Sequence, residues 1–370
     1  MHSSTSAFEQ ESLERIVPRA RWRLIFALTV VIQCVAGVSW EAWWRAHYFV
    51  PEDYEDTPAA WQLQRERATG NATVLIGSSR IWQAIDLDAW QAVTGDRPIQ
   101  LAVAGKNPQP VLRDLANDPA FRGLVLCGVH PYLFFIESQT PMREFMQRGR
   151  AQTLSERASH RIGRVLESWL ASIDNETRLS TLWKRAPLPQ RTGSFPVREV
   201  GKGHMMRADR HASMWARLEQ DPAYTARFQD IWLIFAGGPQ PSLEEKPASD
   251  ETAHPDLVEI VERVAAEVAA DVEKIRARGG DVAFIRLPSV GPLYADETRG
   301  FPRWLAWEPF LARTRTAGVH FADYRQLQGF RLPDWSHMAA GDSDPFTRQL
   351  APLALQAVAA RAGRAPLERR

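Results

Sequence analysis

The sequence has few cysteines and no excess of charge of either sign. Cys34 and Cys127 are the only two cysteines in 370 residues. Cys34 falls in an apolar run and Cys127 in a segment typical of a buried strand, so we expect no disulfide and infer no redox compartment. Lys and Arg number 45 against 44 Asp and Glu. Without a basic run, or basic residues interleaved with aromatic ones, a nucleic-acid partner is excluded.

Motifs for the common cofactors are also missing. The sequence contains no Walker A loop, no G-x-G-x-x-G, no H-E-x-x-H and no C-x-x-C. We therefore predict no metal and no organic cofactor. Apolar residues make up 45% of the chain and charged residues 24%, which predicts a globular body with a core. The 14 tryptophans suit membrane interfaces and sugar sites, but also ordinary cores.

Only one long uncharged apolar run is found, at residues 24–40. Its 17 residues span about 25 Å as a helix, and extension to Trp44 reaches the thickness of a bilayer core. Arginines precede the run, and Trp43 and Trp44 follow it, which favours a retained anchor over a cleaved signal peptide or a buried core helix.

The positive-inside rule then orients the chain in the membrane. We predict a cytoplasmic segment at 1–23, a transmembrane helix at 24–44, and a linker with a first helix at 45–70. The rest would lie outside the cytoplasm, with a bacterial inner membrane and a periplasmic domain as the working hypothesis.

Residues 71–365 alternate between short apolar runs and helical segments. The runs predict strands at 72–77, 98–105, 123–129, 281–288 and 319–324. Helices are predicted at 87–94, from Pro108 to about Asn117, from 255 to Gly279, and from about Asp344 onward. This alternation predicts a three-layer α/β/α sandwich with a flavodoxin-like parallel five-stranded sheet. Residues 137–245 interrupt it as a mostly helical insertion that carries variable substrate contacts.

Two short motifs carry candidate chemistry. Ser79 follows the first predicted strand after Gly77, at the sheet edge where open α/β folds place their sites. Asp334 and His337 are three residues apart before the last helix, so the carboxylate can accept from Nδ1 and leave Nε2 facing a serine. The alternative for Ser79 is an ordinary turn serine that bonds a free backbone N–H.

Together these motifs resemble the SGNH or GDSL-type hydrolase superfamily. Gly77-Ser78-Ser79 matches the nucleophile block except for its acid, Gly105 matches the glycine after the second strand, and Asp334-x-x-His337 matches the last block. The third block, G-x-N-D, is not matched, and His130 stands where its asparagine would be.

The resemblance implies a serine esterase or O-acyltransferase with Ser79, Asp334 and His337 as its triad and no cofactor. Ser79, Gly105 and His130 would form the oxyanion hole, although His130 also fits a structural histidine. Arg80 and Arg286 near strand ends are candidates for binding a substrate carboxylate or phosphate, or else form surface or intra-domain ion pairs.

The anchored, divergent pattern is similar to membrane-tethered members that act in alginate O-acetylation and teichoic acid D-alanylation. It implies an acylated glycan or envelope polymer as substrate and a membrane acyltransferase as partner. The alternatives are a non-catalytic SGNH-like scaffold that binds a glycan or such a partner, and a plain periplasmic esterase.

Overall fold

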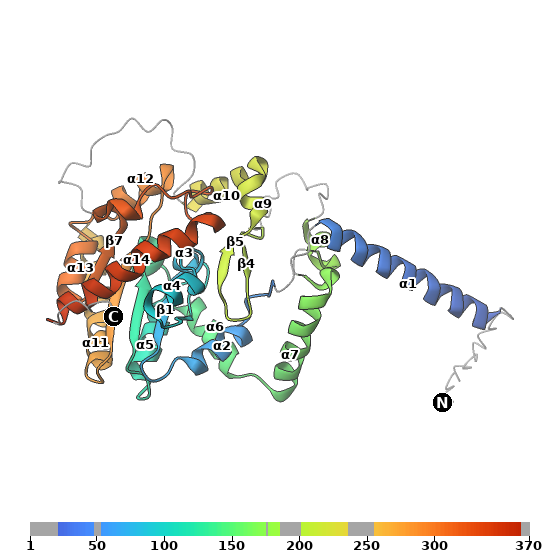
Figure 1. The fold of residues 1–370 in the computed structure, drawn as a ribbon, viewed down its shortest axis with the longest axis horizontal. Helices are drawn as coiled ribbons and strands as arrows, with labels where there is room; N and C mark the ends of the chain where they lie inside the picture. The colour runs from blue at the N-terminus through green and yellow to red at the C-terminus, as the bar shows by residue number, and fades with distance from the viewer. Residues whose placement is uncertain (1–20, 48–52, 175–176, 186–200, 236–254, 364–370) are drawn as a thin grey trace, which may run out of the picture. The chain divides into compact units, whose positions relative to one another are not determined.

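The structure is a computed structural model that describes residues 21–47, 53–174, 177–185, 201–235 and 255–363 (Figure 1). The chain divides into two units, Met1–Phe49 and Val50–Arg370. We describe each unit separately.

In the first unit, the described residues 21–47 form one helix, α1 (Trp22–His47), which includes the whole predicted span at 24–44. Its most apolar 18-residue window has a mean hydropathy of 1.8, and none of that window is buried. At about 1.5 Å per residue a helix of 26 residues is long enough to cross a bilayer. By length and composition, α1 is therefore a candidate transmembrane helix.

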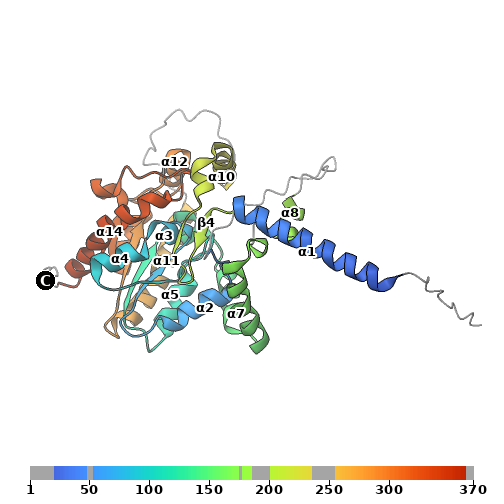
Figure 2. The ribbon, with the colours of Figure 1, turned by 45° about the vertical axis from the view of Figure 1, so that its right-hand side comes forward.

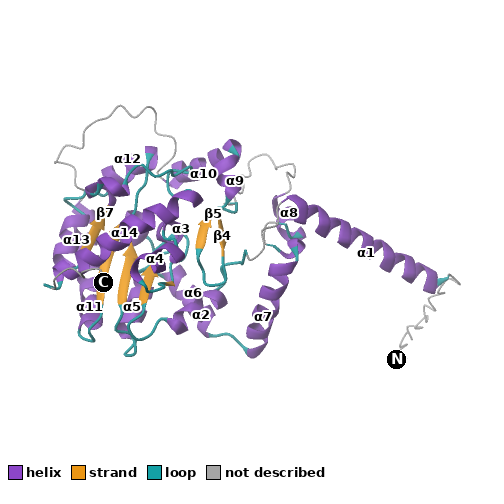
Figure 3. Ribbon diagram, viewed as in Figure 1, coloured by secondary structure: helices purple, strands orange, loops and turns teal. Residues whose placement is uncertain are grey.

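The second unit is built on a sheet of five parallel strands (Figure 3). The strands are β1 (Thr73–Ile76), β2 (Ile99–Gln100), β3 (Leu124–Gly128), β6 (Asp281–Arg286) and β7 (Ala317–His320). Their order across the sheet is β2-β1-β3-β6-β7, and each neighbouring pair is parallel. The predicted number of strands and their parallel direction are confirmed.

Helices pack on the sheet in two separate hydrophobic clusters. Val74 and Ile76 of β1 belong to one cluster with α2 (Pro58–Arg67), α5 (Gln109–Asn117), α11 (Pro255–Arg276) and α13 (Trp307–Thr314). Leu75, between them, belongs to the other cluster with α3 (Ser79–Ala84), α4 (Leu87–Thr94) and α14 (Ala340–Arg361). Because successive strand side chains point to opposite faces, the two clusters lie on opposite sides of β1.

Local sequence explains where several elements begin and end. The Asp86 side chain accepts from the Ala89 N–H at 2.8 Å and caps α4, and Gly95 ends α4 with a φ of +80°. The predicted strand at 319–324 instead ends at His320. The ring of His320 accepts from the Ala322 N–H and starts the 3₁₀ helix η3 (Phe321–Asp323).

The predicted strand at 98–105 is also shorter than expected, because β2 pairs as a strand only over Ile99–Gln100. The N–H groups of Leu101 and Val103 still donate to the carbonyls of Leu75 and Gly77. Further elements flank the sheet: η1 (Tyr132–Ile136), α12 (Gly291–Gly300) and η4 (Arg325–Leu327).

The region predicted as an insertion is mainly helical over its described residues. It contains α6 (Thr140–Arg150), α7 (Leu154–Trp169), η2 (Ala171–Ile173), α8 (Leu179–Arg185), α9 (Ala216–Gln220) and α10 (Pro222–Phe235). It also forms an antiparallel hairpin from β4 (His204–Met206) and β5 (Ala212–Met214), which we did not predict. Strands of three residues are too short to show an alternating pattern in the sequence.

Candidate active site

Ser79 is the first residue of α3, three residues beyond the end of β1. Gly77 adopts a φ of +146° between them. A Cβ at Gly77 would lie 2.6 Å from Cγ2 of Ile81 and 3.0 Å from the carbonyl oxygen of Gly128. Only glycine fits this close approach, which brings Ser79 to the carboxyl edge of the sheet.

The structure brings Ser79, His337 and Asp334 into one hydrogen-bonded chain. The Ser79 Oγ lies 2.7 Å from Nε2 of His337, although the two residues are 258 positions apart. Nδ1 of His337 lies 2.6 Å from Oδ2 of Asp334. Asp334 and His337 are buried, whereas Ser79 is half-buried. The arrangement has the geometry needed to pass the serine proton to the imidazole.

The loop that carries the acid and the histidine is fixed by its own backbone. Oδ1 of Asp334 accepts from the N–H groups of Ser336 and His337 at 3.1 and 2.8 Å. Trp335, between them, adopts a φ of +67°, an uncommon conformation for a residue with a side chain. From α10, Nε1 of Trp232 donates to Oδ2 of Asp334 at 3.2 Å. With Nδ1 of His337, four donors to one carboxylate hold this strained turn at the site.

The same contacts keep Asp334 ionised. Burial by itself raises the pKa of this carboxyl, but the His337 ring and the two backbone N–H groups lower the pKa by a larger amount. The pKa of Asp334 therefore lies below its usual value. An ionised carboxylate holds the Nδ1–H tautomer of His337 and leaves Nε2 as the proton acceptor.

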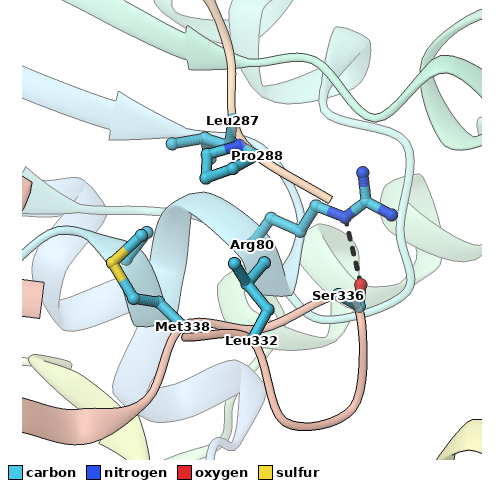
Figure 4. A pocket seen from close by; sticks show the side chains of 7 residues that line it. Arg80, Leu287, Pro288, Leu332, Ser336 and Met338 are labelled. Carbon is cyan, nitrogen blue, oxygen red and sulfur yellow. Dashed lines mark hydrogen bonds between the residues drawn. The ribbon is translucent and has the colours of Figure 1, made fainter. Parts of the chain in front are cut away.

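Arg80 and Arg286 both bind one buried carboxylate, that of Glu297 on α12. Arg80 binds it through both terminal nitrogens, Arg286 lies 2.5 Å from Oε2, and the Ser289 hydroxyl donates to the same oxygen at 2.7 Å. Arg80 Nε also donates to Oγ of Ser336 at 3.0 Å, and Figure 4 shows this contact beside the small pocket formed with Leu332 and Met338. Arg80, Arg286 and Glu297 are all buried.

These contacts match the ion-pair alternative for the two arginines, because their guanidinium groups are occupied by the protein itself. We name the set Arg80, Arg286 and Glu297 the buried charge cluster. Although burial raises the pKa of Glu297, the two guanidinium groups bring it well below its usual value. Glu297 was missed from sequence, since it lies in a polar helix with no motif around it.

Gly105 lies in the turn that follows β2, with a φ of +64°. The Val103 N–H, two residues earlier, donates to the Gly77 carbonyl at 3.1 Å, so this turn is attached to the chain that leads into Ser79. Ser79 itself is in the first turn of α3, where backbone N–H groups lack partners within the helix. Both predicted backbone donors therefore lie just beyond the ends of two neighbouring strands, β1 and β2, at the same edge of the sheet.

His130 follows β3 and faces the buried charge cluster. Its Nε2 lies 3.5 Å from Oε1 of Glu297. Its Nδ1 is buried and has no hydrogen-bond partner among the residues that the structure describes. Burial first, and then the charge of Arg80, put its pKa well below the usual value, so the ring is neutral at neutral pH.

The insertion supplies two further groups near His337. The ring of Trp232 lies 5.5 Å from that of His337, and Gln229 on the same helix donates to the Pro333 carbonyl. The ring of His204 on β4 lies 4.5 Å from that of Trp82 in a tilted arrangement, and burial together with the charge of His337 lowers the pKa of His204 to about 3. Neither Trp232 nor His204 stands in a recognisable motif, so only the fold reveals them.

One group of side chains elsewhere has the composition of a metal site. Ligand atoms of Asp86, Asp88 and His211 lie within 4.8 Å of one another. Arg97 and Arg207 each bind Asp88 at 2.6 Å, however, and Arg207 also contacts His211. These two cations already balance the carboxylates, so the group has the character of a surface ion-pair network.

The chain was compared with models of known protein families and with curated protein sequences, and neither comparison finds a match. The functional interpretation therefore depends on the parallel α/β fold and on the geometry at the edge of its sheet.

Proposed function

We propose that the chain is a membrane-anchored serine esterase or O-acyltransferase of the SGNH type. The hydrogen-bonded chain Ser79–His337–Asp334, at the carboxyl edge of a parallel sheet, carries this proposal. The strand order β2-β1-β3-β6-β7 and the two helix clusters support a flavodoxin-like three-layer sandwich.

In the proposed reaction, His337 removes the hydroxyl proton of Ser79 while Asp334 stabilises the imidazolium. The serine oxygen attacks an ester carbonyl, the alcohol leaves with the proton from His337, and an acyl-enzyme remains. Water completes hydrolysis, or a sugar hydroxyl takes the acyl group, and its proton returns through His337. Both outcomes use the same three residues.

The developing oxyanion would be bound by the backbone N–H groups of Ser79 and Gly105. His130 is the third candidate. A neutral imidazole has a single N–H. Because Oε1 of Glu297 lies 3.5 Å from Nε2 of His130, the carboxylate favours the tautomer that carries this N–H on Nε2. His130 can therefore donate to the oxyanion only when its N–H is turned away from Glu297.

We place the site outside the cytoplasm. The apolar helix α1, preceded by arginines, supports an inner-membrane anchor with a cytoplasmic N-terminus. An acylated glycan or envelope polymer would then be the substrate, with a membrane acyltransferase as a candidate partner. No cofactor is needed for this chemistry.

Ester cleavage by the purified full-length chain tests the proposal. Ser79→Ala should lower the initial rate on p-nitrophenyl acetate by roughly several thousand-fold or more, because the nucleophile is lost. Ser78→Ala, one residue away, is the matched control and should retain most of the rate. Equal rates in wild type and Ser79→Ala would contradict the proposal.

A non-catalytic scaffold is the second candidate, favoured by the missing third block and by the contact between His130 and Glu297. A scaffold would retain its cellular function in Ser79→Ala. Substitutions in the insertion at 137–245 would instead remove that function.

A further inference from the structure

Helix α7 exposes its apolar side to solvent. Leu154, Ile162 and Val165 are 84%, 60% and 61% exposed. Together with Ala158 they recur at steps of three and four residues, so they share one side of the helix. In Figures 1 and 2, α7 stands at the edge of the second unit rather than against the sheet.

The polar side of α7 faces the body instead. The guanidinium of Arg164 lies 4.8 Å from the ring of Tyr54, and its Nη2 donates to the Ala208 carbonyl at 3.4 Å. Glu167, one turn later, accepts a backbone N–H from Glu55. A surface helix of a globular protein usually buries its apolar stripe, so the orientation of α7 is reversed. Because the residues that the structure describes leave this apolar side exposed, it is a candidate surface for a binding partner.

A short stretch of chain joins a packing partner of α7 to the candidate membrane span. Tyr54, which packs on the polar side of α7, follows His47, the last residue of α1, by seven residues. Seven residues reach at most about 25 Å in any conformation. If α1 crosses a bilayer, α7 is therefore tethered near the surface of that bilayer.

Positive charge at the rim of the apolar side of α7 suits the surface of a bilayer. Arg157 and Arg161 are exposed on α7, one turn apart, and border the stripe formed by Leu154 and Val165. Anionic headgroups attract basic side chains beside an inserted apolar face. With 16 residues and several arginines, α7 is too short and too polar to span a bilayer. It would therefore lie in the plane of the interface.

We propose that α7 inserts its apolar side, Leu154, Ala158, Ile162 and Val165, into the headgroup region of the membrane that holds α1. This inference rests on the anchor included in the proposed function. The surface thus recognises an anionic lipid bilayer, and it fixes the body at a second point beyond the single helix.

Fluorescence quenching in vesicles tests this proposal on the full-length chain. A single label, NBD, is placed at Ile162→Cys on α7 or, as a matched control, at Val258→Cys, an exposed valine on α11. Both variants carry Cys34→Ser, and buried Cys127 stays unlabelled. A third sample uses native Cys34, near the middle of α1, to report the anchor. The vesicles contain phosphatidylcholine with or without phosphatidylglycerol, and lipids with a nitroxide near the headgroup or deep in the chain.

The label at Ile162→Cys should shift to the blue and lose most of its intensity with shallow nitroxides, more strongly when phosphatidylglycerol is present. The label at Val258→Cys should show neither change, and the label at Cys34 should be quenched by deep nitroxides. If Cys34 is quenched while Ile162→Cys behaves like Val258→Cys, the α7 inference is wrong and the anchor stands. If Cys34 is not quenched, the anchor itself fails. A blue shift at Ile162→Cys without lipid quenching would show a protein partner or second copy there, and would also overturn the inference.

Discussion

The triad and the buried charge cluster draw residues from the same two segments of the chain, but they differ in how much of each is exposed. Ser79 and Arg80 are neighbours in the chain, as are Ser336 and His337. Ser79 and His337 meet in the triad, whereas Arg80 belongs to the buried charge cluster and donates to the Ser336 hydroxyl. In the triad Ser79, the proposed nucleophile, is half-buried, while in the buried charge cluster both arginines and the carboxylate are buried.

Adjacent residues in these two segments therefore have different roles, one in the proposed chemistry and one in stability. The buried charge cluster ties β6, α12, α3 and the Asp334–His337 loop together through saturated contacts. The triad can then hold its geometry while the Ser79 side chain stays partly exposed. Substitutions in the triad should therefore lower the reaction rate and not the folding stability. Substitutions in the buried charge cluster should lower the folding stability before they affect the rate.

The largest expected effect is on the rate. His337→Ala should lower ester cleavage by roughly a thousand-fold or more, and the double variant Ser79→Ala/His337→Ala should lose little beyond either single one, because triad residues act as a unit. Initial rates with far-UV circular dichroism as a folding check measure this. Independent losses that multiply in the double variant would show that the two residues do not work together.

The charge cluster should dominate stability. Glu297→Gln leaves two buried guanidinium groups without a counter-charge, which should lower the free energy of unfolding by about 3–5 kcal/mol. Urea denaturation of the full chain in detergent measures it. Glu262→Gln, at an exposed position on α11, is the control and should change it by less than about 0.5 kcal/mol. A loss at Glu297 no larger than the control would contradict the comparison.

A third effect concerns pH. With its pKa lowered to about 3, His204 stays neutral in the folded protein but takes up a proton in the unfolded chain near its ordinary value of 6.5. The unfolded state therefore binds more protons as pH falls below 6.5, and folding stability decreases. His204→Gln should remove about 1–2 kcal/mol of the decrease between pH 7 and 5, as measured by urea denaturation at each pH. An unchanged slope in this variant would contradict the assignment.

The smallest effects distinguish two buried serines, Ser336 and Ser78. Ser336→Ala removes the acceptor of Arg80 Nε and should cost about 1 kcal/mol of stability. The Ser78 hydroxyl is buried without a hydrogen-bond partner in the described part of the chain, so Ser78→Ala should be close to neutral. Thermal unfolding of both variants measures this, and equal losses would argue against the separation of the two clusters.

Local patterns predicted most of the sheet and the three triad residues. The strand before Gly77 and the spacing of Asp334 and His337 are short-range features, and Gly95 marked the end of its helix as predicted. Beyond the pairing of Ser79 with His337, which the family resemblance implied, the sequence did not provide the contacts between distant segments. Glu297 meets Arg80 across 217 residues, and Trp232 meets Asp334 across 102. Side chains of this kind look like ordinary surface positions until the fold brings them together.

Helix α7 was hidden for a different reason. Its amphipathic pattern is visible in the sequence, but an apolar stripe ordinarily predicts packing against the core. Only the contacts of Arg164 with Tyr54 and Ala208 reveal that the polar side is the one packed inward.

The central claim is that Ser79 is a nucleophile activated by His337. The most direct measurement is labelling of the full-length chain with a fluorophosphonate, followed by mapping of the labelled peptide. The account predicts one covalent adduct, on the peptide that contains Ser79, and its loss in His337→Ala. Absence of labelling in the folded wild type, or an adduct on a different serine, would contradict the claim.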